Sequence, residues 1–249
     1  MARYFVLYHA YPLLLPRLLS GILSIMRRIW ALADTHLSFA KPKPMDIFGE
    51  HWRDHPAKIE KACRAVIEPN DLLLIPGDLS WALRRAGAEP DLAWLAALPG
   101  TKVLCKGNHD YWWDSDKSLD YPGLHDTPYL SDDGQIGIAG TRGWVLPEPG
   151  CTEAEKMQCE KIISREVARL SKRLDAIAGC SVKIALIHYP PLDVFAPLLK
   201  AHGVQTLLYG HLHLNGKEYP LPERWQGTRA LCVAADRLHF VPRLVASLP

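Results

Sequence analysis

Short apolar runs that end abruptly in polar side chains constrain the fold of this chain more than any other feature. Five of them, each predicted to be a buried strand, occupy residues 29–33, 71–75, 102–105, 181–187 and 206–209. Segments with a helical pattern lie between or beside them, at residues 56–67, 92–98, 152–178 and 195–201. Strands that alternate with helices are typical of βαβ units, so we predict an α/β fold with a largely parallel sheet.

The longest helical segment and the tail of the chain carry two further expectations. Thr152 and Glu155 have the spacing of a capping box, which predicts that the long helix begins directly after Thr152. The apolar stripe of this helix is expected to pack on the core. In the tail, residues 229–235 and 238–241 are expected to form a β-hairpin that turns at Asp236.

Polar side chains capable of metal binding or proton transfer follow all five apolar runs. They are Asp34 and His36, then Asp78, then Asn108 and His109, then His188, and finally His211 and His213. Open α/β sheets bind ligands at the carboxyl ends of their strands, so these groups are expected to meet in one pocket. His109 is suited to proton transfer near neutral pH. The other donors, oxygen and imidazole without thiolate, suit Mn²⁺, iron, Zn²⁺ or Ni²⁺. These seven donors are too many for one tetrahedral site. Their number is about right for two metal ions that share a bridging carboxylate.

The order of these motifs resembles that of the calcineurin-like metallophosphoesterase superfamily. The chain contains Asp-x-His, Gly-Asp, Gly-Asn-His-Asp, a lone His and Gly-His-x-His in the family order, over roughly residues 28 to 215. Residues 77–81, Gly-Asp-Leu-Ser-Trp, and 111–113, Tyr-Trp-Trp, look most like a bacterial branch of predicted phosphohydrolases. The resemblance implies an α/β four-layer αββα sandwich, in which two mixed β-sheets are flanked by helices.

The resemblance also implies a role for each polar residue. Two divalent metal ions would be bound by two sets of residues that share Asp78: Asp34, His36 and His213 in the first, and Asn108, His188 and His211 in the second. His109 would stay outside the metal shell as the acid catalyst, oriented by Asp110. The chain would then be a phosphohydrolase that cleaves a phosphomonoester or phosphodiester by attack of a metal-bridging hydroxide.

Two further residues are candidates for substrate binding. Arg142, in a glycine-flanked loop, could bind a substrate phosphate bidentately, and Trp112 could form a lip for the leaving group. One alternative activity is a phosphodiesterase specific for cyclic nucleotides, nucleic acid or a lipid-linked diphosphate. Another alternative, of a different class, is a scaffold that keeps the fold without catalysis.

Composition limits the partners and the number of domains. With 249 residues, 48% of them hydrophobic, the chain can build one substantial core. A net charge of +2 provides no broad basic surface, so we expect a small phosphoester substrate and no stable binding of nucleic acid. Six cysteines without a Cys-x-x-Cys pair indicate reduced thiols in a cytoplasmic protein.

The first 25 residues are apolar but are interrupted by Pro12, Pro16 and Arg17. These interruptions argue against a membrane anchor, and no small-x-small site suggests a cleaved signal peptide. We expect an N-terminal extension of doubtful authenticity at residues 1–25, with an interfacial segment as the alternative. A single domain is expected at residues 26–249. No feature of the sequence indicates an oligomeric state.

Overall fold

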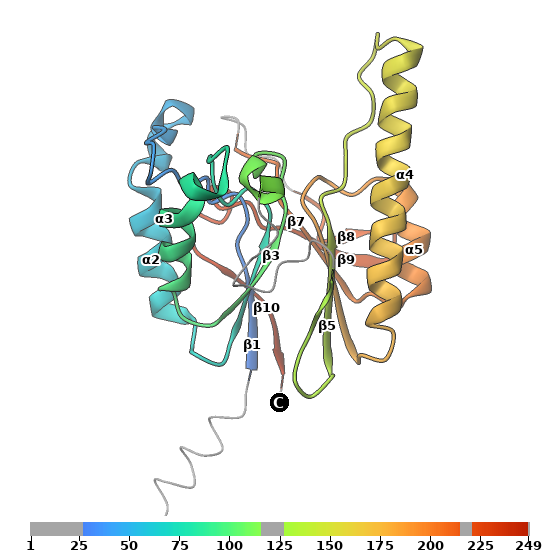
Figure 1. The fold of residues 1–249 in the computed structure, drawn as a ribbon. Coiled ribbons are helices and arrows are strands. Elements are labelled where there is room, and N and C mark those ends of the chain that lie inside the picture. The colour runs from blue at the N-terminus through green and yellow to red at the C-terminus, as the bar shows by residue number, and fades with distance from the viewer. Residues whose placement is uncertain (1–26, 116–126, 215–220, 249) are drawn as a thin grey trace, which may run out of the picture.

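The computed structural model describes residues 27–115, 127–214 and 221–248, so the N-terminal extension lies outside the described residues. Two β-sheets face each other in the middle of the molecule, and helices cover their outer faces (Figure 1). The first sheet has four strands in the order β10 (Arg243–Leu248), β1 (Arg27–Ala31), β2 (Leu72–Pro76) and β3 (Thr101–Cys105). The second has six, in the order β4 (Tyr129–Leu130), β5 (Ile136–Thr141), β6 (Val182–Ile187), β7 (Thr206–Tyr209), β9 (Thr228–Cys232) and β8 (Arg224–Trp225).

The helices form the outer layers of the sandwich. Helices α2 (His55–Val66) and α3 (Arg85–Ala96) pack on the first sheet, and α4 (Glu153–Ala176) and α5 (Ala196–Ala201) pack on the second (Figure 1). In the described part of the chain, four short 3₁₀ helices lie in the connections: η1 (Met45–Phe48), η2 (Glu50–Trp52), η3 (Tyr111–Ser115) and η4 (Asp193–Phe195). The mixed αββα sandwich expected from the sequence is therefore confirmed.

Strand β2 shows why the apolar runs are continuous rather than alternating. Leu72 and Leu74 point into the cluster between the two sheets, whereas Leu73 and Ile75 point into the cluster under α2 and α3. All four are at most 1% exposed. A strand buried on both faces has no solvent side, and each such side chain contributes about 1.5–3 kcal/mol through burial. The central strands are thereby held by packing on both sides, and their carboxyl ends are fixed in place.

Helix α4 begins as the capping box predicted, because Thr152 accepts a hydrogen bond from the Glu155 N–H and Glu155 accepts one from the Thr152 N–H. Its buried residues all come from the second half of the helix, the first of them being Glu166. The N-terminal half projects beyond the edge of the sheets (Figure 1). The prediction that this helix packs on the core holds only for its C-terminal half.

The predicted hairpin in the tail is wrong. Strand β9 pairs with β7 and β8, whereas the last strand, β10, joins the other sheet beside β1. His239 and Phe240 have positive φ angles of 50° and 62°, which a strand does not allow. The chain instead crosses between the sheets, where the Ala33 N–H donates to Val233 O and the Ala235 N–H donates to Ala33 O.

All six cysteines are free, and four of them are buried.

Among the described residues, no helix is both long and apolar enough to cross a bilayer.

Candidate metal centre

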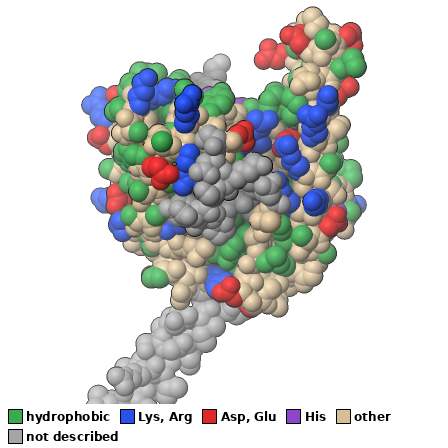
Figure 2. All heavy atoms as spheres, in the orientation of Figure 1, with side chains coloured by type: hydrophobic (Ala, Val, Ile, Leu, Met, Phe, Trp, Pro, Cys, Tyr) green, Lys and Arg blue, Asp and Glu red, His purple; other side chains and the backbone are tan. Residues whose placement is uncertain are grey.

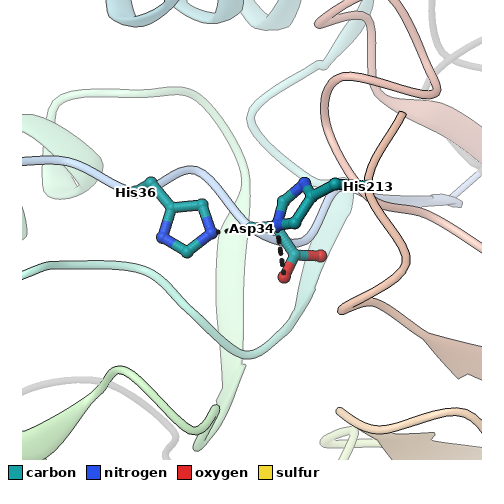
Figure 3. Close-up of side chains that lie close together, drawn as sticks. All are labelled: Asp34, His36 and His213. Carbon is teal, nitrogen blue, oxygen red and sulfur yellow. Dashed lines mark hydrogen bonds and ion pairs between the residues drawn. The ribbon is translucent and has the colours of Figure 1, made fainter. Parts of the chain in front are cut away.

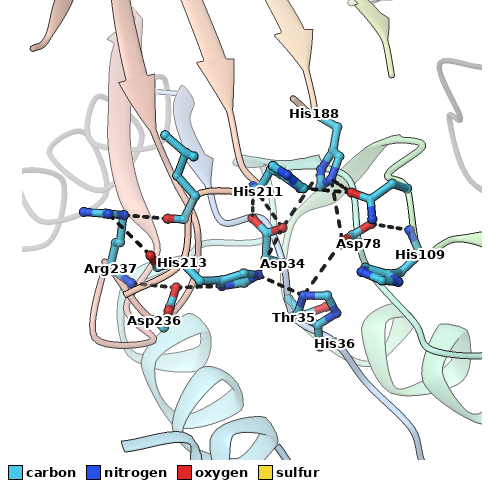
Figure 4. A network of polar contacts seen from close by, with 12 residues as sticks. Asp34, Thr35, His36, Asp78, His109, His188, His211, His213, Asp236 and Arg237 are labelled. Atoms are coloured by element: carbon cyan, nitrogen blue, oxygen red, sulfur yellow. Dashed lines mark hydrogen bonds and ion pairs between the residues drawn. The ribbon is translucent and has the colours of Figure 1, made fainter. Parts of the chain in front are cut away.

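The polar residues predicted to bind metal come together where strands of both sheets end. Asp34 follows β1, Asp78 follows β2 and Asn108 follows β3 in the first sheet. His188 follows β6, and His211 and His213 follow β7 in the second. Figure 4 shows six of these side chains converging: Asp34, His36, Asp78, His188, His211 and His213. The structure therefore assembles one polar centre from all five sequence motifs.

The backbone at this centre is strained in the same way at several positions. Positive φ angles occur at four of the residues: 57° at Asp34, 46° at His36, 54° at Asp78 and 68° at His211. Non-glycine residues in this region cost about 1–3 kcal/mol each and persist where the surroundings fix them. Here the Asp34 N–H donates to Gly77 O at 3.0 Å and the His36 N–H donates to Asp78 O at 3.1 Å. These bonds hold the two loops together and turn the side chains inward.

The first group of donors consists of Asp34, His36 and His213 (Figure 3). Nε2 of His36 lies 3.1 Å from Nε2 of His213, which in turn lies 3.9 Å from Oδ1 of Asp34. Burial, with nearby histidines adding to it, lowers the pKa of His36 well below its usual value. Its imidazole is therefore neutral, which is the form that binds a metal ion.

The second group consists of Asn108, His188 and His211. Oδ1 of Asn108 lies 2.7 Å from Nε2 of His188 and 3.0 Å from Nδ1 of His211. Burial lowers the pKa of His188 to about 3 and that of His211 to about 4. Both rings are therefore neutral as well, and their nitrogen atoms converge with an amide oxygen.

Asp78 lies between the two groups. Its Oδ2 is 3.8 Å from Nε2 of His36 and 3.6 Å from Nε2 of His188. Burial raises the pKa of Asp78 to about 6, and burial together with the charge of Asp78 raises the pKa of Asp34 well above its usual value. Asp34 and Asp78 are two buried carboxylates that repel each other, and the imidazoles around them are neutral. A divalent cation bound between these groups would stabilise both carboxylates in their charged form. The donor set therefore fits divalent metal ions, with oxygen and nitrogen ligands only.

Two of the histidines are oriented by acceptors on the far side of their rings. Nδ1 of His188 lies 2.9 Å from Pro76 O, and Nδ1 of His213 lies 3.1 Å from Oδ1 of Asp236. Such contacts fix the tautomer, so that Nε2 is left to face the centre. Sequence reasoning missed Asp236 and assigned it to a turn. The sequence did contain a signal for Asp236. This residue directly follows the apolar run 230–235, just as the other site residues follow apolar runs.

Asp110 does not orient the His109 ring, contrary to the expectation. Its carboxylate accepts hydrogen bonds from five groups: the backbone N–H groups of Asp78, Leu79, Ser80 and Gly107, and the Trp112 indole. A Cβ on Gly107 would overlap Oδ1 of Asp78, so the two loops approach each other too closely for a larger residue. Asp110 thus fixes the loop that carries Asp78 against the loop that carries Asn108.

His109 is positioned by other contacts. Its ring lies 4.2 Å from that of Trp81, centroid to centroid, and its backbone N–H donates to Oδ1 of Asp78 at 2.8 Å. Trp81 also stacks on His36 at 4.8 Å. The ring of His109 is therefore held beside the first group of donors by an aromatic residue that sequence reasoning did not assign to the site.

The structure bears differently on the two residues predicted to contact the substrate, Trp112 and Arg142. Trp112 is fully buried and bonded to Asp110, so the expectation that it forms a lip of the site is wrong. Its neighbour Tyr111 is 56% exposed. Arg142 packs over the Trp144 ring at 4.5 Å, and its charge adds to burial in lowering the pKa of His188. Its contact with a substrate phosphate stays a prediction.

Comparison with known proteins identifies the family. The sequence profile described as calcineurin-like phosphoesterase matches residues 27–215, which include all seven proposed metal donors. The chain belongs to this family. The family, together with the clusters Asp34, His36, His213 and Asp34, Asp78, His188, makes it a metal-dependent phosphoester hydrolase.

Three proteins similar to this phosphoesterase share 14–29% sequence identity with it over the aligned residues. The Gene 66 protein of Mycobacterium phage L5 is 29% identical over 85 residues, which are 34% of this chain and 41% of the phage protein. The phosphopantetheinyl hydrolase PptH from Mycobacterium tuberculosis shares the fold, with a TM-score of 0.56 and 16% identity over 88% of this chain and 95% of that one. The protein of unknown function AQ665 from Aquifex aeolicus gives a TM-score of 0.46 and 14% identity over the same shares.

Proposed function

We propose that this phosphoesterase hydrolyses a small phosphomonoester or phosphodiester at a centre of two divalent cations. The supporting observation is the place of Asp78, whose Oδ2 lies within 4 Å of one histidine from each donor group. In this proposal Asp34, His36 and His213 would hold one cation, and Asn108, His188 and His211 would hold the other. Asp78 would be shared by the two groups.

The chemistry follows from the residues around this centre. When bound, two divalent cations would supply a hydroxide nucleophile at neutral pH and stabilise charge on the phosphoryl oxygens. A new bond forms between phosphorus and the oxygen of the attacking hydroxide, the bond between phosphorus and the leaving oxygen breaks, its electron pair stays on the leaving oxygen, and that oxygen takes up a proton. His109 lies outside both donor groups, with its ring centroid 5.6 Å from that of His36, and in this proposal it donates a proton or a hydrogen bond to the leaving oxygen. Burial lowers its pKa while the charge of Asp78 opposes the shift. A neutral His109 would act through an N–H hydrogen bond to the leaving oxygen.

A nuclease that tracks along nucleic acid is disfavoured by the distribution of charge. The net charge is +2, and Figure 2 shows Lys and Arg side chains interspersed with acidic and apolar ones over the visible face. Nucleic-acid affinity depends on neutralising many phosphates at once, which requires a continuous basic surface. We therefore favour a small substrate.

The test combines metal analysis with turnover assays. The protein is loaded in turn with Mn²⁺, Zn²⁺, Ni²⁺ or Fe²⁺ and assayed with p-nitrophenyl phosphate and bis-p-nitrophenyl phosphate. Faster hydrolysis of the diester would favour a phosphodiesterase, and two ions bound per chain are expected. A phosphopantetheinyl ester belongs in the substrate panel because a protein of the same fold carries that activity in its name. No turnover of any ester by metal-replete protein would favour the scaffold alternative.

A further inference from the structure

A cavity of about 390 Å³ opens directly beside the metal centre. Three histidines line it: His36 and His213 from the first donor group, together with His109. The remaining described residues around it are apolar or aromatic, namely Met45, Phe48, Trp52, Trp81 and Leu214. Its volume falls within the range of about 300–1,000 Å³ that is usual for small-molecule sites.

The aromatic walls are fixed by the same contacts that fix the histidines. Trp81 stacks on His36 at 4.8 Å and contacts His109 at 4.2 Å. Trp52 is 2% exposed and lies edge-on to His213 at 5.6 Å. The cavity is thus built into the site and does not depend on the arrival of a ligand to form.

Apart from the three imidazoles, the described residues that line the cavity carry few polar groups, and the Lys43 ammonium lies 4.0 Å from the Trp81 ring centroid. The Trp81 indole N–H donates to Sδ of Met45 at 3.3 Å, and Nδ1 of His213 faces Asp236. Among the described residues that line the cavity, none has a carboxylate, amide, hydroxyl, ammonium or guanidinium side chain. A sugar or other polyhydroxy group placed against Met45, Phe48 and Trp52 would find few hydrogen-bond partners there to replace its bonds to water, which disfavours it.

We infer that this cavity binds the leaving group of the substrate, and that this group is an apolar chain or ring. The inference rests on the proposed function, in which His109 donates a proton or a hydrogen bond to the leaving oxygen. Because His109 is part of the cavity wall, a leaving group whose oxygen is next to His109 extends over Trp81 and toward Phe48. Phosphoesters of hydrophobic alcohols are therefore the preferred substrate class.

A matched series of substrates tests this inference. The 4-methyl-, 4-ethyl-, 4-propyl- and 4-butylphenyl phosphates have leaving groups of nearly equal basicity that differ in apolar length. We expect kcat/KM of the metal-loaded protein to rise up to about three- to fourfold for each added CH₂ until the cavity is filled. A flat or falling series, with turnover present, overturns the inference and leaves the proposed function standing.

Two phenylalanine variants locate the effect. Phe48 lines the cavity and is 59% exposed, so Phe48→Ala is expected to fold and to lower the ratio of kcat/KM between the butyl and methyl esters several-fold. Phe39, 44% exposed and packed near Trp94 instead, provides the control Phe39→Ala, which keeps the ratio of the unmodified protein. Equal ratios in the two variants would mean that the apolar group binds elsewhere.

A binding measurement separates failure of the inference from failure of the proposed function. The affinities of 4-butylphenylphosphonate and 4-methylphenylphosphonate, which cannot be hydrolysed, are compared by calorimetry on the metal-loaded protein. Tighter binding of the butyl compound, reduced by Phe48→Ala, supports the apolar cavity even where no ester is turned over. Equal affinities overturn it, whereas absent turnover with unequal affinities counts against the proposed function alone.

Discussion

The Asp236 carboxylate lies 3.1 Å from Nδ1 of His213, on the opposite side of the ring from the nitrogen that faces Asp34. Asp236 is itself held by the backbone N–H groups of Leu214, at 2.8 Å, and Arg237, at 3.0 Å. A carboxylate in this position keeps the proton on Nδ1 and makes Nε2 a stronger donor to a metal ion. The tail of the chain therefore contributes to the centre without supplying a proposed metal ligand.

Replacing this carboxylate should weaken metal binding. We expect Asp236→Asn to lower the affinity for Mn²⁺ or Zn²⁺ by about 10- to 100-fold, since the ring loses its charged partner. Calorimetric titration of metal-free protein measures the change. Asp132→Asn, at an exposed carboxylate, is the control and should match the unmodified protein. Equal affinities in all three proteins would show that Asp236 does not tune the metal site.

The donors themselves could be predicted from the sequence because each follows a buried apolar run. The end of a buried apolar run shows where a strand ends. Side chains that follow the carboxyl ends of parallel strands then lie together at one edge of the sheet. The contacts behind the donors depend on tertiary structure instead. Asp236 meets His213 only because the tail crosses between the sheets, and Asp110 accepts four backbone N–H groups from its own loop and the neighbouring one rather than the ring beside it in sequence.

The same distinction explains the errors in the fold. The segment that forms β2 is apolar throughout and buried on both faces, a pattern that few structures other than a central strand can accommodate. Strands of this kind were predicted correctly. The tail was read as a hairpin because two apolar runs flank a polar pair. The path of the tail is decided by the pairing of residues 233–235 with Ala33, two residues after the end of β1. This contact joins residues about 200 positions apart, so local sequence patterns do not predict it.

His109 provides a test that separates catalysis from metal binding. We expect His109→Ala to lower kcat by roughly 10²- to 10⁴-fold, because the leaving oxygen loses its proton or hydrogen-bond donor. Metal content should stay near that of the unmodified protein, since His109 lies outside both donor groups. Asn108→Ala is the comparison and should reduce the metal content. Loss of both metal ions from His109→Ala would identify His109 as a ligand.

Asp110 should be essential to the stability of the centre. Asp110→Ala leaves four backbone N–H groups and the Trp112 indole without their acceptor in a buried position. We expect a loss of about 3–5 kcal/mol in the free energy of unfolding, measured by urea denaturation of the metal-free protein. Asp114→Ala removes an exposed carboxylate that pairs with Lys106 and should cost at most about 1 kcal/mol. Similar losses in the two variants would contradict the role given to Asp110.

Asp71 makes the stability of the first sheet depend on pH, far from the metal donors. Burial alone would raise the pKa of this carboxyl, but hydrogen bonds from the N–H groups of Glu68 and Arg28 and from the Trp30 indole outweigh it and lower the pKa. A lowered folded-state pKa stabilises the protein above the unfolded value of about 3.9. The contribution is lost as the pH falls through the lower, folded-state value.

The neutral variant Asp71→Asn isolates this contribution. We expect the unmodified protein to exceed the variant by about 2 kcal/mol in free energy of unfolding near pH 6, because the hydrogen bonds are made to a charged acceptor. The difference should shrink when the pH is lowered below about 4, as Asp71 takes up a proton. Urea denaturation of both metal-free proteins across this range measures it, and the titration of the metal donors cancels because both proteins share them. A difference that stays constant down to about pH 3 would show that the charge of Asp71 does not stabilise the sheet.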